Sequence, residues 1–460
     1  MSLPCLPRPG SNRDPLRHDL TPHPVPIAAL RPLGRAARRH PAAQLAKLAR
    51  SLERFGFVLP VLIDGQGRVI GGWALVQAAR RLDLVEVPAV TLGDLDEAEA
   101  RALRLALDRL AEDADWNRDE LRLELDAILE FDMAFELEAI GFETAEIDLM
   151  LGESVETEAD DAVPEGDGDA PPVTRPGDLW GLGPHRVLCA DATEAAAYAR
   201  LLGDDRARLV FTDPPYNVPI PGHVSGLGRH RHGDFAMASG EMSEAAFTDF
   251  LATVFGHLAA HGTDGALHYV CMDWRHLHEA LTAGKRVYSA LKNLCVWNKT
   301  NAGMGSLYRS KHELVLVFKA GTAPHVNTVA LGRHGRSRSN VWDYPGLAAF
   351  GAGRDAALAR HPTVKPVALV ADAIRDALRR GDLVLDPFLG SGTTVIAAAK
   401  TGRRCAGLEL DPVYVDRILE RWQAWGGETP VLEETGESFT AVAARRATKP
   451  TERRAENHDD

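Results

Sequence analysis

Short apolar segments alternate with helix-like segments along residues 173–427, and this alternation limits the folds that the chain can adopt. Apolar runs that read as buried strands occupy 209–212, 266–271, 314–318 and 383–385. Runs of this length, separated by amphipathic stretches, are typical of strands joined by crossover helices. The pattern therefore predicts an α/β domain built on a doubly wound, Rossmann-like parallel sheet.

A smaller α/β module is predicted ahead of this sheet. Residues 42–55 form a helix in which Leu45, Leu48, Ala49, Leu52 and Phe55 share one face. Residues 60–72 read as a β-hairpin around the turn at 65–67, and a helix over 74–82 and a strand over 85–92 follow. Helical spacing of Leu121, Leu125 and Ile128 continues the helical pattern to about residue 151.

The stretch that joins the two parts is acidic. Residues 153–169 contain many acids and no Lys or Arg, so we expect 153–172 to be a solvated linker that proteases cut readily. The predicted organisation is an arm over 1–25, the small module over 26–110, a helical extension over 111–152, this linker, the large domain over 173–428 and a flexible tail over 429–460.

The positions of cysteine, histidine and apolar residues argue against several classes of protein. The five cysteines are Cys5, Cys189, Cys271, Cys295 and Cys405. They form no CxxC pair, so we expect neither a zinc site nor a disulfide framework, and a reducing cytoplasm fits. His276 and His278 cannot share a helical face, so we expect no metal. The chain has no run of eighteen apolar residues, and we expect no membrane span.

The net charge of −13 argues against a nucleic-acid partner, but the distribution of charge weakens that objection. Basic clusters occur at 229–232 and 333–338. A local basic surface matters more for phosphate binding than the total charge does.

The tetrapeptide Asp213-Pro-Pro-Tyr216 follows the strand candidate 209–212 directly. The nitrogen of an amine on an aromatic ring is a poor nucleophile, because its lone pair is delocalised into the ring. The Asp213 carboxylate and the Pro214 carbonyl can accept hydrogen bonds from such an amine, and Tyr216 offers a face for stacking. Stacking contributes roughly 1–3 kcal/mol per base, comparable with the few kcal/mol that extraction of a base from a helix costs. The structural alternative is a proline-rich turn that ends a strand.

A glycine-containing turn over 386–394 reads as the link between a strand and a helix. Gly390 and Gly392 allow a ligand to approach the backbone closely. Glu409 ends the next strand, where an acid can bind both hydroxyls of a ribose. Because the three spaced glycines of a dinucleotide fingerprint are missing, the turn favours an adenosyl ligand without phosphates.

Together, and in this order, these motifs resemble the amino-group DNA methyltransferases of the permuted beta class. The resemblance spans about 176–422 and includes Gly177-Asp-Leu-Trp-x-Leu-Gly, Trp297-x-Lys299 and Arg309-x-Lys-His-Glu313. It implies transfer of a methyl group from S-adenosylmethionine to the exocyclic amine of a flipped base in double-stranded DNA. The first letter of the loop, Asp213, favours N6 of adenine, with N4 of cytosine as the alternative.

The resemblance and the local patterns together give a set of expected site residues. The catalytic loop is Asp213, Pro214, Pro215 and Tyr216. The expected S-adenosylmethionine-binding residues are Asp191, Thr363, Lys365, Asp386, Phe388, Gly390, Ser391, Gly392, Thr393 and Glu409. Asp191 is assigned to the adenine or the amine of the ligand, Thr363 and Lys365 to its methionine end. Their alternatives are a strand-ending turn and a helix entry with proline at its start. Residues 320–360 fall where the family carries target recognition.

The small module resembles the ParB-like N-terminal domain. The resemblance rests on His40-Pro-x-x-Gln44, Phe55-Gly-Phe57, Pro60-Val-Leu-Ile-Asp64 and Val69-Ile-Gly-Gly72 leading into Ala78-Ala79-Arg80. Members usually carry an arginine after the glycines, where it meets a nucleotide phosphate. Leu75 stands at that place here, which puts nucleotide binding in doubt and leaves docking as the alternative.

Two other readings remain beside the DNA methyltransferase. A methylase of protein glutamine or RNA usually has Asn as the first loop letter, placed after the glycine turn, so Asp213 and the motif order argue against it. A non-enzymatic ParB-like DNA-binding protein would carry an inactive methylase domain, against which the intact motifs argue. A homodimer is also left open. We expect a protein that begins near Pro172 to keep basal methylation.

Overall fold

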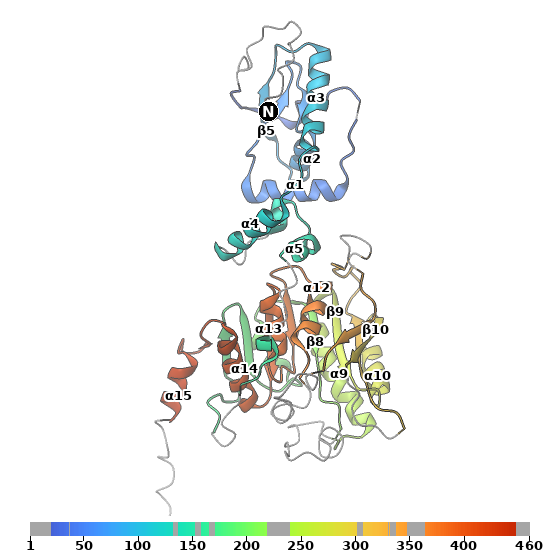
Figure 1. Ribbon diagram of the computed structural model, residues 1–460, viewed down its shortest axis with the longest axis vertical. Coiled ribbons are helices and arrows are strands. Elements are labelled where there is room, and N and C mark those ends of the chain that lie inside the picture. The colour runs from blue at the N-terminus through green and yellow to red at the C-terminus, as the bar shows by residue number, and fades with distance from the viewer. Residues whose placement is uncertain are drawn as a thin grey trace, which may run out of the picture. The chain divides into compact units, whose positions relative to one another are not determined.

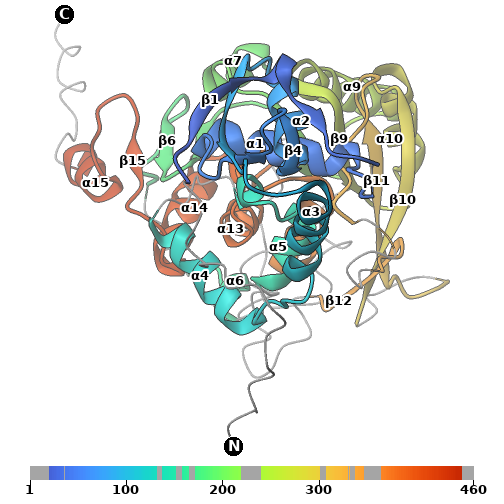
Figure 2. The same ribbon diagram turned by 90° about the horizontal axis from the view of Figure 1, so that it is seen from above.

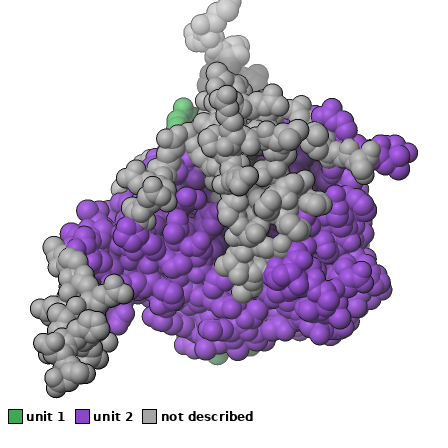
Figure 3. Space-filling model, turned by 90° about the horizontal axis from the view of Figure 1, so that it is seen from below, with its two compact units in different colours: residues 1–143 green, residues 144–460 purple. Residues whose placement is uncertain are grey.

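The computed structural model describes residues 20–35, 37–131, 137–151, 158–164, 171–218, 240–300, 307–329, 331, 337–346 and 364–447. The chain divides into two compact units, Met1–Glu143 and Thr144–Asp460 (Figure 3). The boundary falls inside the predicted helical extension 111–152, so only the last part of that extension, 144–152, belongs to the larger unit.

The first unit is a small α/β module. Its elements are β1 (His23–Pro26), η1 (Ile27–Ala29), β2 (Arg31–Pro32), α1 (Ala42–Phe55), β3 (Val61–Ile63), β4 (Arg68–Gly71), α2 (Trp73–Arg81), β5 (Glu86–Thr91), α3 (Glu97–Ala111), α4 (Arg118–Phe131) and η2 (Leu137–Ile140). The sheet has the order β1-β5-β3-β4-β2, and the antiparallel pair β3–β4 confirms the predicted hairpin. Helix α1 buries Leu45, Ala49 and Leu52 as predicted, whereas Phe55 at its last position is 46% exposed.

The second unit contains a ten-stranded mixed sheet (Figure 1). Its elements are α5 (Thr144–Met150), α6 (Glu158–Asp161), β6 (Leu179–Leu182), β7 (His185–Cys189), α7 (Ala195–Leu202), β8 (Ala207–Thr212), α9 (Glu244–His261), β9 (Gly262–Met272), α10 (Leu277–Val287), β10 (Ala290–Lys299), β11 (His312–Lys319), β12 (Val341–Tyr344), α12 (Val367–Ala377), β13 (Leu383–Asp386), α13 (Thr393–Lys400), β14 (Arg404–Glu409), α14 (Pro412–Trp425), β15 (Val431–Leu432) and α15 (Phe439–Ala447). The sheet order is β12-β10-β11-β9-β8-β13-β14-β7-β6-β15.

The predicted α/β class is confirmed, but the sheet is not parallel throughout. Its five central strands, β9-β8-β13-β14-β7, are parallel. On one side β11 runs antiparallel to both β9 and β10, and on the other β6 runs antiparallel to β7 and β15. Two of these antiparallel pairs, β10–β11 and β6–β7, join consecutive strands and so need no crossover helix, whereas the outermost strand β12 runs parallel to β10.

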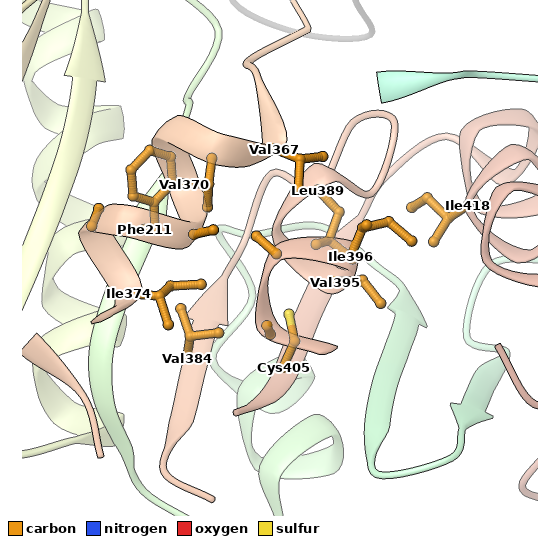
Figure 4. Close-up of a cluster of buried hydrophobic side chains, with 14 of the residues drawn as sticks. Phe211, Val367, Val370, Ile374, Val384, Leu389, Val395, Ile396, Cys405 and Ile418 are labelled. Atoms are coloured by element: carbon orange, nitrogen blue, oxygen red, sulfur yellow. The ribbon is translucent and has the colours of Figure 1, made fainter. Parts of the chain in front are cut away.

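Helices cover both faces of the sheet, because alternate residues of each strand point to opposite sides. In β8, Leu209 and Phe211 pack in a cluster with residues of α12, α13 and α14, as Figure 4 shows for Phe211 beside Val370 and Ile374. Val210 faces the other cluster, which includes residues of α7, α9 and α10. Helices α9 and α10 lie together beside β9–β11 (Figure 2). This double covering makes the central strands almost wholly buried.

The acidic stretch before the large domain does not behave as a solvated linker where the structure describes it. Just ahead of this stretch, in α5, Asp148 forms a two-point ion pair with Arg403, at 3.0 and 2.8 Å, and both side chains are buried. In α6, Asp160 is buried and pairs with Lys400 of α13. The expectation of a solvated 153–172 is therefore wrong for Asp160 and Asp161, because buried cations of the second unit need acidic partners.

Neither a membrane-spanning helix nor a metal-binding cluster is found in the described part of the chain. No helix there is long and apolar enough to cross a bilayer. No group of three or more His, Cys, Asp or Glu side chains gathers there in an arrangement that could hold a metal ion.

Candidate active site

A cavity opens at the carboxyl ends of β8, β13 and β14, where loops of neighbouring parallel strands meet at one edge of the sheet. It holds about 1240 Å³ of atom-free space, part of it open to solvent. The lining residues are Ala190, Ala192, Phe211, Asp213, Pro214, Pro215, Tyr216, Val364, Lys365, Val370, Asp386, Pro387, Phe388, Leu389, Gly390, Ser391, Thr393, Thr394, Glu409, Leu410, Asp411 and Tyr414. The 213–216 loop and the glycine turn, 170 residues apart in sequence, thus share one cavity.

The 213–216 loop is held by its own side chains and by the residue after it. The Tyr216 hydroxyl donates to Asp213 Oδ1 at 2.6 Å. Asn217 adopts a left-handed conformation, with φ of 52°. Its side-chain oxygen accepts from the backbone N–H groups of Gly240 and Met242, and its amide donates to the Met242 carbonyl at 2.8 Å. These bonds fix the chain as it leaves the loop.

Lys365 is the central cation of the site. Its ammonium group lies 2.5 Å from Asp213 Oδ2, 3.1 Å from Glu313 Oε2 and 3.2 Å from the Tyr216 hydroxyl oxygen. Three acceptors match the three N–H donors of a lysine. The Lys365 side chain is only 5% exposed, while 23% of Asp213 remains exposed. Lys365 therefore orients Asp213 and leaves part of its carboxylate open to the cavity.

A second acid and a second lysine complete this cluster. Glu313 of β11 forms an ion pair with Lys299 of β10 as well as with Lys365. Burial alone would raise the pKa of Glu313, but the charges of Lys365 and Lys299 outweigh burial and lower it to about 2. Burial raises the pKa of Asp213, against the opposing effect of Lys365. The two acids and two lysines form an electrically balanced cluster beside the cavity.

The glycine turn is tied to the end of β14. Glu409 Oε2 accepts the Gly390 N–H at 2.8 Å, and Oε1 accepts the Asp411 N–H at 3.0 Å. Asp386, at the end of β13, accepts the Thr394 hydroxyl at 2.6 Å and the Phe388 N–H at 3.1 Å. Burial raises the pKa of Glu409 and of Asp386 to about 7, although backbone hydrogen bonds oppose the rise at both.

Helix α13 begins directly after the turn without a side-chain cap. Gly392 is its N-cap residue and has a φ of 81°, which disfavours other residues. A Cβ at Gly392 would lie 3.0 Å from a methyl carbon of Ile418. Gly392 is therefore required by the backbone and by packing, and it is absent from the cavity lining. Ser391 and Thr393, by contrast, both line the cavity.

Most of the predicted site residues gather at this cavity, and three do not fit as expected. Asp191 is absent from the lining, and its Oδ1 accepts the N–H and hydroxyl of Thr193 at 2.7 and 2.8 Å. Lys365 lines the cavity but bonds to Asp213, so it is not free for the methionine end of a ligand. Gly392 acts as described above. Thr363 lies outside the described residues.

The predicted basic and recognition segments are only partly visible. Residues 229–232 lie outside the described chain, as do 330, 332–336 and 347–360 of the predicted recognition segment. Of the 333–338 cluster, Arg338 pairs with Asp372 and Asp376, so its charge is neutralised within the unit. Phosphate contact by Arg338 is therefore not supported.

Several site residues carry no prediction from sequence. Glu313 and Lys299 belong to motifs that carry the resemblance, but neither had a role. Asp411 and Tyr414 line the cavity directly after Glu409, a position that signals proximity to any ligand of that acid. Arg421, buried behind the glycine turn, left no signal because an isolated arginine in a helix normally faces solvent.

Comparisons with known proteins match two segments of the chain. A DNA methylase model of the N6/N4 methyltransferase family matches residues 207–420. A model of the ParB-methyltransferase HTH domain matches residues 119–176. Among relatives, the type II methyltransferase M.HpaI of Haemophilus parainfluenzae is 26% identical over 51% of this chain and 73% of its own. The type II methyltransferase M2.MboI of Moraxella bovis is 25% identical over 50% of this chain and 84% of its own.

Two solved structures align with parts of the chain. PvuII DNA methyltransferase (cytosine-N4-specific) aligns with a TM-score of 0.41 and 15% identity, over 61% of this chain and 96% of that one. The C-terminally truncated chromosome-partitioning protein ParB from Caulobacter crescentus aligns with a TM-score of 0.25 and 21% identity, over 28% of this chain and 74% of that one.

The ordered motifs predict this family, and the match of residues 207–420 to its model confirms that prediction. Residues 207–420 carry the family match, and the cavity they enclose joins the 213–216 loop to the glycine turn. Residues 207–420 thus match the DNA methylase model of the N6/N4 methyltransferase family, and residues 119–176, ahead of them, match the ParB-methyltransferase HTH domain.

Proposed function

We propose that the protein methylates N6 of adenine within a specific sequence of double-stranded DNA, acting on a base flipped out of the helix. The observation that carries the proposal is that Asp213 and Tyr216 line the same cavity as Glu409 and the glycine turn. A loop suited to an amine and a loop suited to an adenosyl ligand therefore face one space. The Asp at the start of the loop favours adenine.

The residues of the cavity fit the methyl donor. We assign Glu409 to the ribose hydroxyls, since its carboxylate lines the cavity and already accepts two backbone N–H groups. Phe388, Leu410 and Tyr414 give the cavity apolar walls for an adenine ring. S-Adenosylmethionine supplies an electrophilic methyl group on a positively charged sulfur. Asp386, Gly390, Ser391 and Thr393 are the other proposed contacts or supports.

Asp213 is proposed to accept a hydrogen bond from the target amine. Its two oxygens offer about four lone-pair positions. Tyr216 and Lys365 each occupy one, so acceptor capacity remains for the N–H of a base. The Pro214 carbonyl is the second proposed acceptor, and both prolines stiffen the loop. With its N–H groups bound in this way, the amine lone pair is directed at the methyl group.

No covalent enzyme intermediate is needed for this reaction. A bound S-adenosylmethionine would supply the methyl carbon to the amine nitrogen, and its sulfur would keep the electron pair of the broken carbon–sulfur bond. The methylated amine then loses one proton to solvent. The protein contributes alignment and acceptors that are already in place, which are large terms in catalysis. Lys365 contributes by holding the Asp213 carboxylate charged and oriented.

The test is to identify the modified base directly. The full chain is expressed in a host free of DNA methylation, and its DNA is digested to nucleosides for mass spectrometry, with an Asp213→Ala variant as control. We expect N6-methyladenine from the wild type and none from the variant. N4-methylcytosine without N6-methyladenine would overturn the base assignment and leave the methylase in place. Light scattering on the purified chain would test the homodimer, which stays a prediction.

A further inference from the structure

We infer that Asp160 and Asp161 are positioning residues of the methylase site, although they precede the matched methylase segment. This inference rests on the proposed cofactor site. Both lie in the stretch matched by the HTH model, 119–176, and not in 207–420. One of them supports the glycine turn through Arg421, and the other supports the segment that carries Lys365.

Asp160 is fixed to the methylase unit by contacts on two helices. Its carboxylate forms an ion pair with Lys400, the last residue of α13, and accepts the indole N–H of Trp425 of α14 at 3.0 Å. Its backbone carbonyl accepts from Arg421 Nη2 at 2.7 Å. The carboxylate contacts therefore hold the carbonyl in place over a buried guanidinium.

Arg421 connects Asp160 to residues that line the cavity. Its Nη1 lies 2.9 Å from the Ser391 carbonyl oxygen, 3.1 Å from the Ser391 hydroxyl and 3.2 Å from the Thr393 hydroxyl. Arg421 is 2% exposed, so these contacts are made away from water, where an unpaired charge is costly. Ser391 and Thr393 both line the cavity, so contacts lead from Asp160 through Arg421 to two residues of the proposed cofactor site.

Asp161 supports the other side of the site. Its carboxylate accepts the backbone N–H of Val367 at 2.8 Å. Val367 is the first residue of α12, and its N–H is one of the donors that a helix leaves without an internal partner. Lys365, which bonds to Asp213, stands two residues earlier. Asp161 thus fixes the helix entry from which Lys365 reaches the 213–216 loop.

Binding of S-adenosylmethionine by the full chain, measured by calorimetry, tests the first half of the inference. We expect Asp160→Ala to raise the dissociation constant at least tenfold. Asp249→Ala is the matched control, because it also removes an aspartate that forms an ion pair. Both Asp249 and its partner Arg286 are exposed, so this substitution should leave the dissociation constant unchanged. Melting temperatures are recorded for every variant, and binding is measured well below them.

The second half is tested by two substitutions at one position. Asp161→Ala removes the acceptor for Val367, whereas Asp161→Asn keeps an oxygen there. We expect Asp161→Ala to lower kcat at saturating cofactor at least tenfold and Asp161→Asn to stay within threefold of the wild type. A merely stabilising role would lower the melting temperature of Asp161→Ala and leave its kcat unchanged.

Equal cofactor affinity in Asp160→Ala and the wild type, with only the melting temperature changed, would overturn the assignment of Asp160. If Asp160→Ala does not fold, Trp425→Phe keeps an aromatic ring at this position and removes the indole N–H bonded to Asp160 together with the five-membered ring. We expect it to raise the dissociation constant about threefold, and an unchanged constant counts against the inference. A wild type that fails to bind the cofactor would refute the proposed site itself, a different result.

Discussion

Removal of residues 1–171 should destabilise the methylase unit severely, whereas removal of residues 1–143 should not. The expectation drawn from composition was that a protein beginning near Pro172 would keep basal methylation. The structure argues otherwise, because Asp148 and Asp160 would be lost while their partners Arg403 and Lys400 remain. A protein beginning at Thr144 keeps both pairs and has the boundary of the compact unit.

The size of the effect follows from burial. Removal of one partner of a buried ion pair costs about 3–5 kcal/mol, because a charge is left unpaired away from water. The Arg403 side chain is fully buried and that of Lys400 is 10% exposed, so both pairs qualify. Taken as additive, the two losses amount to about 6–10 kcal/mol. The whole free energy of unfolding of a typical domain is about 5–15 kcal/mol.

The assay is urea unfolding of the two truncated proteins, followed by circular dichroism. We expect the Pro172 protein to unfold at a far lower urea concentration or to be insoluble, with the Thr144 protein folded. As a control, Lys400→Met and Arg403→Met together in the Pro172 protein remove both orphaned charges and should recover part of the lost stability. Equal unfolding midpoints for the two truncated proteins would refute the reasoning.

Three further predictions concern the site. Asp213→Ala should abolish methyl transfer in a tritium assay while calorimetry still detects cofactor binding, because Glu313 continues to pair with Lys365; near-normal transfer would exclude a role for Asp213. Glu409→Ala should raise the dissociation constant for S-adenosylmethionine 10–100-fold, or about 1.4–2.8 kcal/mol, the range of charge-assisted hydrogen bonds; an unchanged constant would mean that another group holds the ribose. Because burial raises the pKa of Glu409 to about 7 and two hydroxyl donors favour its charged form, affinity should increase from pH 6 to pH 8 with release of a proton. Glu409→Gln should flatten that pH profile, and a flat wild-type profile would contradict the assignment.

The parts of the site that the sequence predicts well are those set by one strand and the loop after it. Asp213 follows β8, Asp386 ends β13 and Glu409 ends β14, and these three strands are neighbours in the parallel part of the sheet. Parallel strands bring their carboxyl ends to one edge. Prediction of the strands therefore also predicts that these acids lie close together. The structure agrees, because all three line the same cavity.

The pairing of side chains from distant segments escapes such reasoning. Lys365 was assigned to a ligand because it precedes a helix near the cofactor residues, but it bonds to Asp213, 152 positions earlier. The local pattern of 361–366 places a cation at the cavity without indicating which acid it meets. Glu313 arrives from β11, an antiparallel strand whose position in the sheet the alternating pattern does not reveal.

Composition alone fails to predict that acids of the stretch 153–172 are buried. A segment rich in acids and poor in aromatic residues is read as solvated because burial of an unpaired charge is costly. That reasoning treats the segment alone. Arg403 and Arg421 are buried by folding of the methylase unit, and each would be an uncompensated charge without acids supplied from elsewhere in the chain. Asp161 and Asp160 of the acidic stretch place negative charge near Arg421, and Asp148, just ahead of that stretch, pairs with Arg403. The same cost that predicts solvent exposure for an isolated acid therefore favours burial here.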